Sequence, residues 1–427
     1  MAKTKTSNTP VVDDIFKQLI GQHNKISPGS AMMGTELESE ITTWISSGSF
    51  LLDMILSNSP DGGWPCGRIV QVFGPESIGK STLGYVAMAN CQKQGGIVIY
   101  ADIENAANKK FMSMLGVDLN RMVWVNTENV EDLFAALEEN LKLIINTPAF
   151  KGKPILIVID SIAALQTKSE VENNYEANMN ISLAKAKQLH KAFRKITHYV
   201  SKANACMFCV DQIKENTTGY GPKWVLSGGK ALPFFSSIRL YLEGKKRIVA
   251  KDPAIENEYQ SAVAAWKAAG GNKSGVEKPE KPKVEEVTIG FEISAYTVKN
   301  KTAPPERPAH FRIIFAEGLK DEECYLDYLV KYGAVKQSGA YFEIVGWPND
   351  HGKFYKSAWL SDVICEVETY NKVKEFLTKK LTIDLKGNNS YAIVDSDITN
   401  VEQELMSKMK ELKKDEANSE DNYDDEE

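Results

Sequence analysis

The chain has 427 residues, of which 43% are hydrophobic and 25% are charged. This balance is typical of a globular protein with one large core domain and smaller appendages. The sequence contains no apolar run of about 18 residues, the minimum for a membrane span, and it begins without the apolar stretch of a secretory signal. We therefore expect a cytoplasmic protein with no membrane partner.

The net charge of −6 is unevenly distributed along the chain. Residues 415–427 contain eight acids and no base, so the rest of the chain carries a net charge of +2. An acidic block of this kind is typical of a disordered, solubilising tail. The alternative is that the tail competes with nucleic acid for basic surface on the same molecule. The charge of the body is therefore compatible with a polyanionic partner.

The spacing of cysteine and histidine predicts neither a disulfide framework nor a structural metal. Six cysteines lie in apolar surroundings, which favours reduced thiols in the core. Cys206 and Cys209 have a spacing found in redox sites, but both lie in one strand-like run, and no second pair completes a zinc site. Buried thiols are the expectation for this pair.

Residues 1–46 are expected to form an N-terminal arm. Residues 11–20 are amphipathic, and a helix of about ten residues cannot bury its own apolar stripe. We therefore expect this helical arm to pack on the core or on a neighbouring subunit.

Residues 47–320 alternate short, apolar, β-branched runs with longer helical periods. This pattern predicts an α/β domain with a doubly wound, mostly parallel sheet. The strand candidates are residues 69–73, 97–101, 155–159, 205–210 and 237–242.

The first of these strands runs into the most informative motif of the chain, G-x-x-x-x-G-K-[ST]. Its backbone N–H groups can surround phosphate oxygens, its lysine supplies a positive charge, and its hydroxyl can ligate magnesium. A strand before the loop and a helix over residues 81–90 provide the context that a P-loop requires. The alternative is a turn that only joins strand and helix. The motif consists of Gly74, Pro75, Glu76, Ser77, Ile78, Gly79, Lys80, Ser81 and Thr82.

Two carboxylates follow predicted strands of the same sheet. Asp160 ends the apolar run of residues 155–159, and Glu104 follows the run of residues 97–101. Ligands of open α/β sheets bind at the carboxyl ends of the strands. We therefore expect Asp160 to share a magnesium ion with Ser81, and Glu104 to orient or deprotonate a water molecule that attacks the terminal phosphorus. Taken alone, a carboxylate after a strand is more often a solvated turn residue.

The remaining segments differ in composition from the core. Residues 250–286 read as an insertion, with a helix that starts near Pro253 and a linker rich in Lys, Glu and Pro. Residues 321–400 are predicted to form a small α+β C-terminal module that binds DNA, and residues 401–427 a charged helix and the acidic tail. The lysines of the module fit either a phosphate-facing patch or the solvated side of a helix. They are Lys353, Lys356, Lys372, Lys374, Lys379 and Lys380.

Several sequence blocks together resemble the bacterial RecA recombinase family. The blocks are GPESIGKST, ILIVIDSIAAL, FCVDQIK, SGGKALPFFSSIRL and VKNKTAPP, with WISSGSFLLDMIL upstream. They occur in family order and cover about residues 11–381. The inserted segment and the divergent loops suggest a phage-type member.

The resemblance implies roles at an ATP site. The loop of residues 74–82 would bind ATP with Mg²⁺, Glu104 would activate water, and Asp160 would belong to the magnesium site. Gln212 matches a glutamine that senses the terminal phosphate and relays its presence to the DNA-binding loop. Lys299 and Lys301 match lysines that reach the phosphates bound by a neighbouring subunit.

Some positions depart from the family pattern. Asn108 and Phe111 stand on the adenine side where an acid and a tyrosine are usual, which leaves the nucleotide preference open. Asp211 replaces a usual asparagine beside Gln212. Phe234 matches an aromatic residue of the subunit interface.

The resemblance also assigns DNA-binding loops, the first to residues 169–181 and the second to residues 214–229. Basic residues near them would contact phosphates, aromatic residues would stack on or wedge between bases, and glycines would let the backbone approach. The residues assigned to DNA are Lys187, Arg194, Lys214, Tyr220, Trp224, Gly228 and Gly229.

These features predict an ATP-dependent homologous recombinase. It would form a helical filament on single-stranded DNA, hydrolyse ATP in response to DNA, and exchange strands with homologous double-stranded DNA, with loader or mediator proteins as further partners. One alternative is a ring-shaped helicase of the same fold, which would need an arginine in trans where Lys299 and Lys301 stand. The other is an ATP-switched filament that serves as a scaffold for proteins. Imaging separates the ring from the helix, and a strand-exchange assay separates the scaffold from the recombinase.

Overall fold

The computed structural model describes residues 9–27, 32, 41–172, 179–215, 224–226, 229–251, 253–271, 277–280, 282, 286–315, 317–345, 347 and 352–383. The chain divides into two units, Met1–Thr42 and Thr43–Glu427. The first unit contains helix α1 (Thr9–Ile26). Within it, the side chains of Ile15, Phe16 and Leu19 are exposed, so the helix presents an apolar surface.

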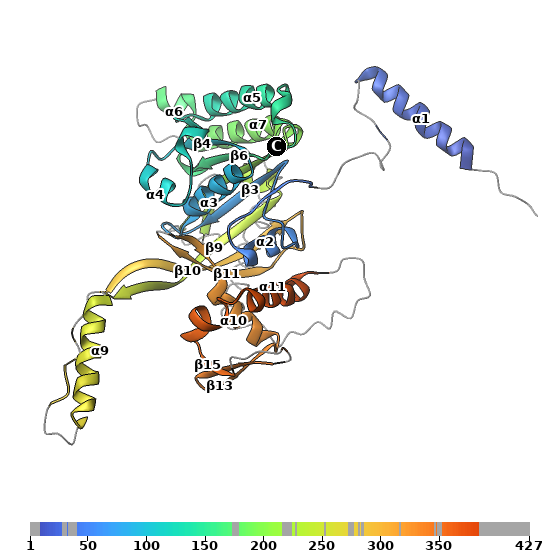
Figure 1. Cartoon of the computed structure of the whole chain (residues 1–427). Coiled ribbons are helices and arrows are strands. Elements are labelled where there is room, and N and C mark those ends of the chain that lie inside the picture. Colours follow the sequence, from blue (N-terminus) through green and yellow to red (C-terminus); the bar gives the residue numbers. More distant parts are fainter. Residues whose placement is uncertain are drawn as a thin grey trace, which may run out of the picture. The chain divides into compact units, whose positions relative to one another are not determined.

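A sheet of ten strands forms the centre of the second unit in the described part of the chain (Figure 1). The strand order is β12-β11-β10-β9-β3-β7-β6-β4-β5, and β8 pairs with β7. The parallel part consists of β3 (Arg68–Gly74), β4 (Ile97–Asp102), β5 (Met122–Val125), β6 (Ile155–Asp160), β7 (Ala205–Glu215) and β9 (Ile238–Lys251). The antiparallel pairs involve β10 (Glu286–Asn300), β11 (Pro308–Ile314), β12 (Gly318–Lys320) and β8 (Trp224–Leu226).

Helices cover both faces of this sheet, as its strand sequences require. Alternate residues of β6 enter two different cores, with Leu156 and Val158 in one and Ile155, Ile157 and Ile159 in the other. A strand that is buried on both faces reads as a continuous apolar run. Helix α3 (Lys80–Lys93) contributes to the first core. Helices α5 (Val130–Ile145) and α7 (Met179–Lys202) contribute to the second, so the predicted α/β core is confirmed.

Shorter elements connect these layers. The α-helices among them are α4 (Lys109–Met114), α6 (Lys168–Glu172) and α8 (Ala231–Phe235). Turns of 3₁₀-helix lie at Leu119–Arg121, Pro148–Phe150 and Ile162–Ala164.

The insertion is built on an extended β-hairpin. Strands β9 and β10 stay paired as far as Lys251 and Glu286, and helix α9 (Pro253–Ala268) lies in the connection between them (Figure 1). The strand predicted over residues 237–242 therefore runs nine residues further, to Lys251. Its extension contains Lys245, Lys246 and Arg247, whose polarity conceals a strand from a search for apolar runs.

The C-terminal module follows β12 and packs on the core. It contains α10 (Glu322–Lys331), β13 (Val335–Ser338), β14 (Tyr341–Ile344), β15 (Lys353–Tyr355), a π-helical turn (Trp359–Val363) and α11 (Val367–Leu381). Its partner on the core side is α2 (Phe50–Ser57), which contacts α11 and whose Phe50 ring packs against Tyr325 of α10. The small sheet of β1 (Trp44–Ile45) and β2 (Trp64–Pro65) packs beside α2 and α3.

Polar contacts fix this junction. Buried Asp321 accepts hydrogen bonds from Ser49 Oγ at 2.7 Å and from Leu51 N at 2.8 Å. Arg307 donates to Met54 O at 2.9 Å and to Leu381 O at 2.5 Å, which ties α2 to the end of α11. The predicted module continued to residue 400 and was followed by a charged tail; residues 384–427 lie outside the described part.

Candidate nucleotide-binding site

The loop between β3 and α3 has backbone angles that only small residues adopt easily. Gly79 has a φ of 91°, and a Cβ atom at this position would lie 2.3 Å from Ile313 Cδ1. A Cβ atom at Gly74 would lie 2.3 Å from the carbonyl oxygen of Leu242. Both glycines are therefore required by close approach, and α3 starts immediately after Gly79 with its free N–H groups directed toward the loop.

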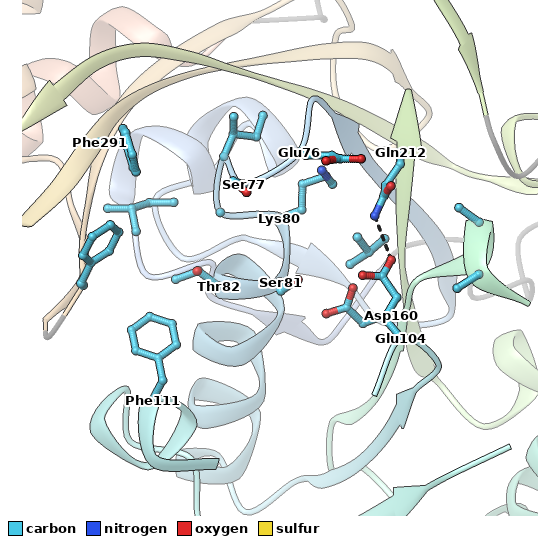
Figure 2. Close-up of a pocket in the computed structure, with 17 residues that line it drawn as sticks. Glu76, Ser77, Lys80, Ser81, Thr82, Glu104, Phe111, Asp160, Gln212 and Phe291 are labelled. Atoms are coloured by element: carbon cyan, nitrogen blue, oxygen red, sulfur yellow. Dashed lines mark hydrogen bonds between the residues drawn. The ribbon is translucent and has the colours of Figure 1, made fainter. Parts of the chain in front are cut away.

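The loop borders a cavity of about 700 Å³. Three groups of residues line this cavity (Figure 2). They are most residues of the loop, three polar residues near strand ends, and an apolar wall. The lining consists of Glu76, Ser77, Ile78, Gly79, Lys80, Ser81, Thr82, Glu104, Phe111, Asp160, Ala163, Ala164, Val210, Gln212, Phe291, Ile313 and Phe315. Gly74 and Pro75 contribute backbone to the loop but do not line the cavity.

Lys80 lies at the centre of this cavity (Figure 2). It is only 6% exposed, and its Nζ donates hydrogen bonds to the carbonyl oxygens of Gly74 at 3.1 Å and Pro75 at 2.5 Å. Burial lowers the pKa of Lys80, and the charges of Asp160 and Glu104 oppose this shift. The ammonium group is thus held at the loop, where a phosphate group would compensate its desolvation.

Glu104 and Gln212 meet at the carboxyl ends of β4 and β7. Gln212 Nε2 donates to Glu104 Oε1 at 2.8 Å (Figure 2), and Ser161 Oγ donates to the same oxygen at 2.5 Å. The turn that carries Glu104 is fixed by Asp102, whose carboxylate accepts hydrogen bonds from the N–H groups of Ala106 and Ala107. Two donors thus hold one carboxylate oxygen in a defined position.

Asp160 lies beside these groups at the end of β6. Burial raises the pKa of Asp160 to about 6, the charges of Glu104 and Asp102 add to the shift, and a hydrogen bond with Ser81 opposes it. The hydroxyl and the carboxylate are oxygen donors of the kind that magnesium prefers. The sheet edge therefore gathers the five residues that the sequence assigned to one triphosphate, namely Lys80, Ser81, Glu104, Asp160 and Gln212.

The opposite end of the cavity is apolar. Phe111 from α4 faces Phe291 from β10 across it (Figure 2), and Ile313 and Phe315 complete the wall. Sequence reasoning missed Phe291, Ile313 and Phe315. The cross-strand pairing of Phe291 with Ile313 brings them together, and no local motif marks such a pairing.

Asn108, which the sequence placed on the adenine side, does not line the cavity. It is exposed and caps helix α4, where its Oδ1 accepts a hydrogen bond from the N–H of Phe111 at 3.0 Å. Its contact with the site is therefore indirect, through the helix that carries Phe111.

Lys299 and Lys301 also lie away from the cavity of their own chain. Lys299 Nζ donates to the carbonyl oxygens of Pro233 at 2.9 Å and Phe234 at 3.1 Å, at helix α8. Lys301 is exposed, and the Phe234 side chain beside this group is 68% exposed. Both lysines thus occupy an outer surface next to α8.

The residues assigned to DNA fall in two places. Lys187 and Arg194 are exposed on α7 and line one hollow with His190, Lys191 and Lys195. Lys214 belongs to β7 and pairs with Val225 of β8, the strand that contains Trp224. Gly229 has a φ of 73° just before α8. Tyr220 and Gly228 lie outside the described residues, as do residues 173–178 of the first loop and all side chains from residue 214 to 228.

Several lysines of the C-terminal module have partners within the chain. Lys356 pairs with Asp327 at 3.2 Å and Lys372 with Glu368 at 2.6 Å. Lys374 Nζ lies 4.8 Å from the ring centroid of Phe50. These contacts favour the solvated helix side over a dedicated phosphate patch, although exposed pairs of this kind are weak and open easily.

Five of the six cysteines are buried, as the sequence predicts, whereas Cys365 is exposed. Burial raises the pKa of Cys66 to about 12 and holds the thiol protonated. Among the described residues there is no cluster of three or more His, Cys, Asp or Glu side chains that could hold a metal ion. In the same part of the chain, no helix combines the length and the apolar character that crossing a membrane requires.

Comparison with known proteins agrees with this geometry. Residues 14–275 match the model of the RecA N-terminal domain. A protein RecA from Campylobacter jejuni subsp. doylei is 34% identical over 74% of this chain and 80% of the relative. A protein RecA from Sulfurimonas denitrificans is 34% identical over 77% of this chain and 83% of the relative, and one from Borrelia duttonii is 32% identical over 75% of each. The chain therefore belongs to the RecA family.

Proposed function

We propose that this RecA-family chain, an ATP-dependent recombinase of DNA recombination and repair, hydrolyses ATP in the cavity at the end of β3, β6 and β7. The observation that carries the proposal is the meeting of a P-loop lysine, two carboxylates and a glutamine amide in one cavity. Hydrolysis of a nucleoside triphosphate needs groups of this kind to bind the phosphates, to activate the attacking water and to sense the terminal phosphate.

Each polar residue has a separate role in the proposal. Lys80 and the loop N–H groups bind the phosphates, and Glu104 accepts a proton from the attacking water. Ser81 and Asp160 would hold a magnesium ion, which neutralises phosphate charge when it is bound. Gln212 donates to the terminal phosphate in exchange for its bond to Glu104, so that phosphate binding frees one oxygen of the base.

The apolar wall accounts for base binding. Phe111, Phe291 and Phe315 offer aromatic faces on which a purine ring can stack. Asn108 acts through the capping of α4. The wall at this end is mostly apolar, with the Thr82 side chain close to Phe111 (Figure 2), so base discrimination would depend mainly on shape.

DNA binding is proposed for the basic face of α7 and the segments that flank it. Lys187, Arg194 and Lys214 would contact phosphates, so affinity would fall steeply with salt and depend little on sequence. Tyr220 and Trp224 would stack on bases, and Gly228 and Gly229 would admit a phosphate to the backbone. Homology would be read by pairing between single-stranded and double-stranded DNA.

Filament assembly is proposed for the surface around α8. Phe234 would contact the next subunit, and Lys299 and Lys301 would approach the phosphates bound there, which would make hydrolysis depend on assembly. The apolar face of α1 would dock on a neighbouring copy. Loader or mediator proteins stay a prediction from the sequence.

The test compares wild-type protein with Glu104→Gln in ATPase, strand-exchange and imaging experiments. The variant should bind ATP and form helical filaments on single-stranded DNA, while its hydrolysis rate should drop about 10²- to 10⁴-fold because the general base is lost. Glu139→Gln, on the exposed side of α5, is the matched control and should behave as wild type.

Three outcomes would count against the proposal. Unchanged turnover in Glu104→Gln would remove this residue from its role. Rings in negative-stain images with a slowly hydrolysed ATP analogue would favour a helicase, and filaments without strand exchange would favour a scaffold.

A further inference from the structure

A chain of buried polar side chains crosses the sheet beneath the phosphate end of the cavity. It runs from Arg239 on β9 through Gln71 on β3 to Asp211 on β7, three strands that are neighbours in the sheet. These side chains are 4%, 0% and 0% exposed, respectively. Burying a charged side chain costs free energy unless hydrogen bonds compensate it. The charges of Arg239 and Asp211 therefore need matched donors and acceptors inside the sheet.

The hydrogen bonds of this chain have a fixed direction. Arg239 Nε donates to Gln71 Oε1 at 2.7 Å, and Gln71 Nε2 donates to Asp211 Oδ2 at 2.8 Å. The second carboxylate oxygen, Asp211 Oδ1, accepts the backbone N–H of Gln212 at 2.9 Å. The arginine fixes which way the Gln71 amide points, and the amide in turn fixes Asp211.

Asp211 therefore uses both oxygens, one toward the sheet interior and one toward Gln212. The side chain of the same Gln212 donates a hydrogen bond to Glu104 in the cavity. Gln212 also lies opposite Gly74 in the pairing of β7 with β3, so its backbone position is set relative to the phosphate-binding loop.

We propose that Asp211, Gln71 and Arg239 are positioning residues that hold the backbone of Gln212 where its amide can pass between Glu104 and a terminal phosphate. This inference rests on the proposed function, because it assigns the mechanical support of the phosphate sensor. None of the three residues lines the cavity, and the hydrogen bond from the N–H of Gln212 to Asp211 links them to the phosphate sensor.

The donor and acceptor inventory gives a sharp test. In Asp211→Asn, the side chain keeps one acceptor, so it must lose either Gln71 or the N–H of Gln212. In Gln71→Glu, the new carboxylate still accepts from Arg239, but it faces Asp211 without a donor. In the double variant Gln71→Glu with Asp211→Asn, the asparagine amide donates to the glutamate and its oxygen accepts from Gln212. Each single variant breaks one of the three hydrogen bonds from Arg239 to Gln212, and the double variant can form a bond in each of the three places.

The matched control is a second buried glutamine that is unrelated to the sensor. Gln92 on α3 donates to Asp118 O at 2.8 Å and accepts from Asp118 N at 2.9 Å. Gln92→Glu also loses a buried donor, so it reports the cost of such a change to stability alone.

The experiment measures the ratio of single-stranded DNA affinities with and without a slowly hydrolysed ATP analogue, together with kcat, KM and Tm. In both single variants this ratio should fall about tenfold or more, as expected when one buried hydrogen bond is broken. Their kcat should fall by a larger factor than their KM rises. The double variant should return to the wild-type ratio. Gln92→Glu should lower Tm and leave the ratio unchanged.

Other outcomes overturn the proposal. It is wrong if both single variants keep the wild-type ratio, or if the double variant is no better than the singles. If a single variant does not fold, the double variant must still fold and respond, and a double variant that fails to do so overturns the proposal as well. A wild-type protein with no response to the analogue contradicts the proposed function itself, whereas a normal wild-type response shared by both singles contradicts only the positioning role.

Discussion

The two ends of the cavity are built in different ways. The phosphate end takes its groups from one continuous loop and from strand ends, with Lys80 and Gln212 as examples. The base end takes aromatic side chains from α4, β10 and the residue after β11, which are far apart in sequence. Each polar residue is thus marked by a local signal, a motif or the end of an apolar run, whereas the apolar wall depends on how distant strands pair.

This difference has consequences for function. At the phosphate end, each group contributes a directed interaction with developing charge, so removal of one group should affect the reaction rate strongly. At the base end, the wall contributes nondirectional apolar contact area. Removal of one ring should therefore weaken nucleotide binding and leave the hydrolysis rate of the bound nucleotide nearly unchanged.

The largest effect is expected for Lys80→Ala. The substitution removes a buried ammonium group from the phosphate end, so ATP hydrolysis should fall by about 10²- to 10³-fold or more, and ATP should no longer drive cycles of filament assembly. The measurement is DNA-stimulated phosphate release, with nucleotide binding followed separately. Lys93→Ala, at the exposed end of the same helix, is the control. Equal losses in both variants would show that the effect belongs to the helix and not to the cavity.

The next effect concerns Gly79 of the loop, which lies close to Ile313 of the apolar wall. Gly79→Ala would place a methyl group 2.3 Å from Ile313 Cδ1 at a φ of 91°. Backbone strain of this kind costs about 1–3 kcal/mol, so both Tm and ATP affinity should fall. The double variant with Ile313→Val removes the clashing atom and should recover part of the affinity.

Gly152→Ala separates strain from clash. Gly152 also has a positive φ, of 77°, but a Cβ atom there has no neighbour within 4 Å. This control should lower Tm and leave ATP affinity unchanged. If Ile313→Val gives no recovery in the Gly79→Ala background, the contact between the loop and the wall does not matter for binding.

A smaller effect is expected from the aromatic wall. Phe111→Ala and Phe291→Ala each remove a ring whose burial against a base is worth about 1–3 kcal/mol, so Kd for ATP should rise by roughly 5- to 100-fold, with kcat at saturation nearly unchanged. Comparison of ATP with other triphosphates in both variants checks whether the wall discriminates bases. A large fall in kcat with unchanged Kd would contradict the division between the two ends.

The parts of the fold that were predictable are those with local signals. The continuous apolar run of β6 marks a strand buried on both faces, and the P-loop motif marks the turn into α3. The meeting of Glu104 and Asp160 follows from parallel strands, since Asp102 and Asp160 are in register at one sheet edge. The sequence pattern therefore placed Lys80, Ser81, Glu104 and Asp160 at one sheet edge, where they line one cavity, and the family resemblance added Gln212; the roles of these residues stay predictions.

The rest depends on long-range packing. Phe291 joins the wall because β10 pairs with β11, and a pairing register is not visible in either strand alone. The buried chain under Gln212 was missed because Gln71 and Arg239 are polar, and polar residues within a strand suggest an exposed face. The extension of β9 was missed because Glu243, Lys246 and Arg247 interrupt its apolar pattern beyond the body of the sheet.

The smallest effect is expected for Asn108→Ala. Asn108 was assigned to the adenine side from its position in the chain, whereas its side chain caps α4 through the N–H of Phe111. Loss of a helix cap costs about 1 kcal/mol, and only the fraction of this cost that displaces Phe111 can reach the nucleotide. Kd for ATP should therefore rise less than in Phe111→Ala. In the double variant Asn108→Ala with Phe111→Ala, the cap should add nothing further to Kd, because the ring through which it acts is already absent. An additive effect would instead place Asn108 in direct contact with the base.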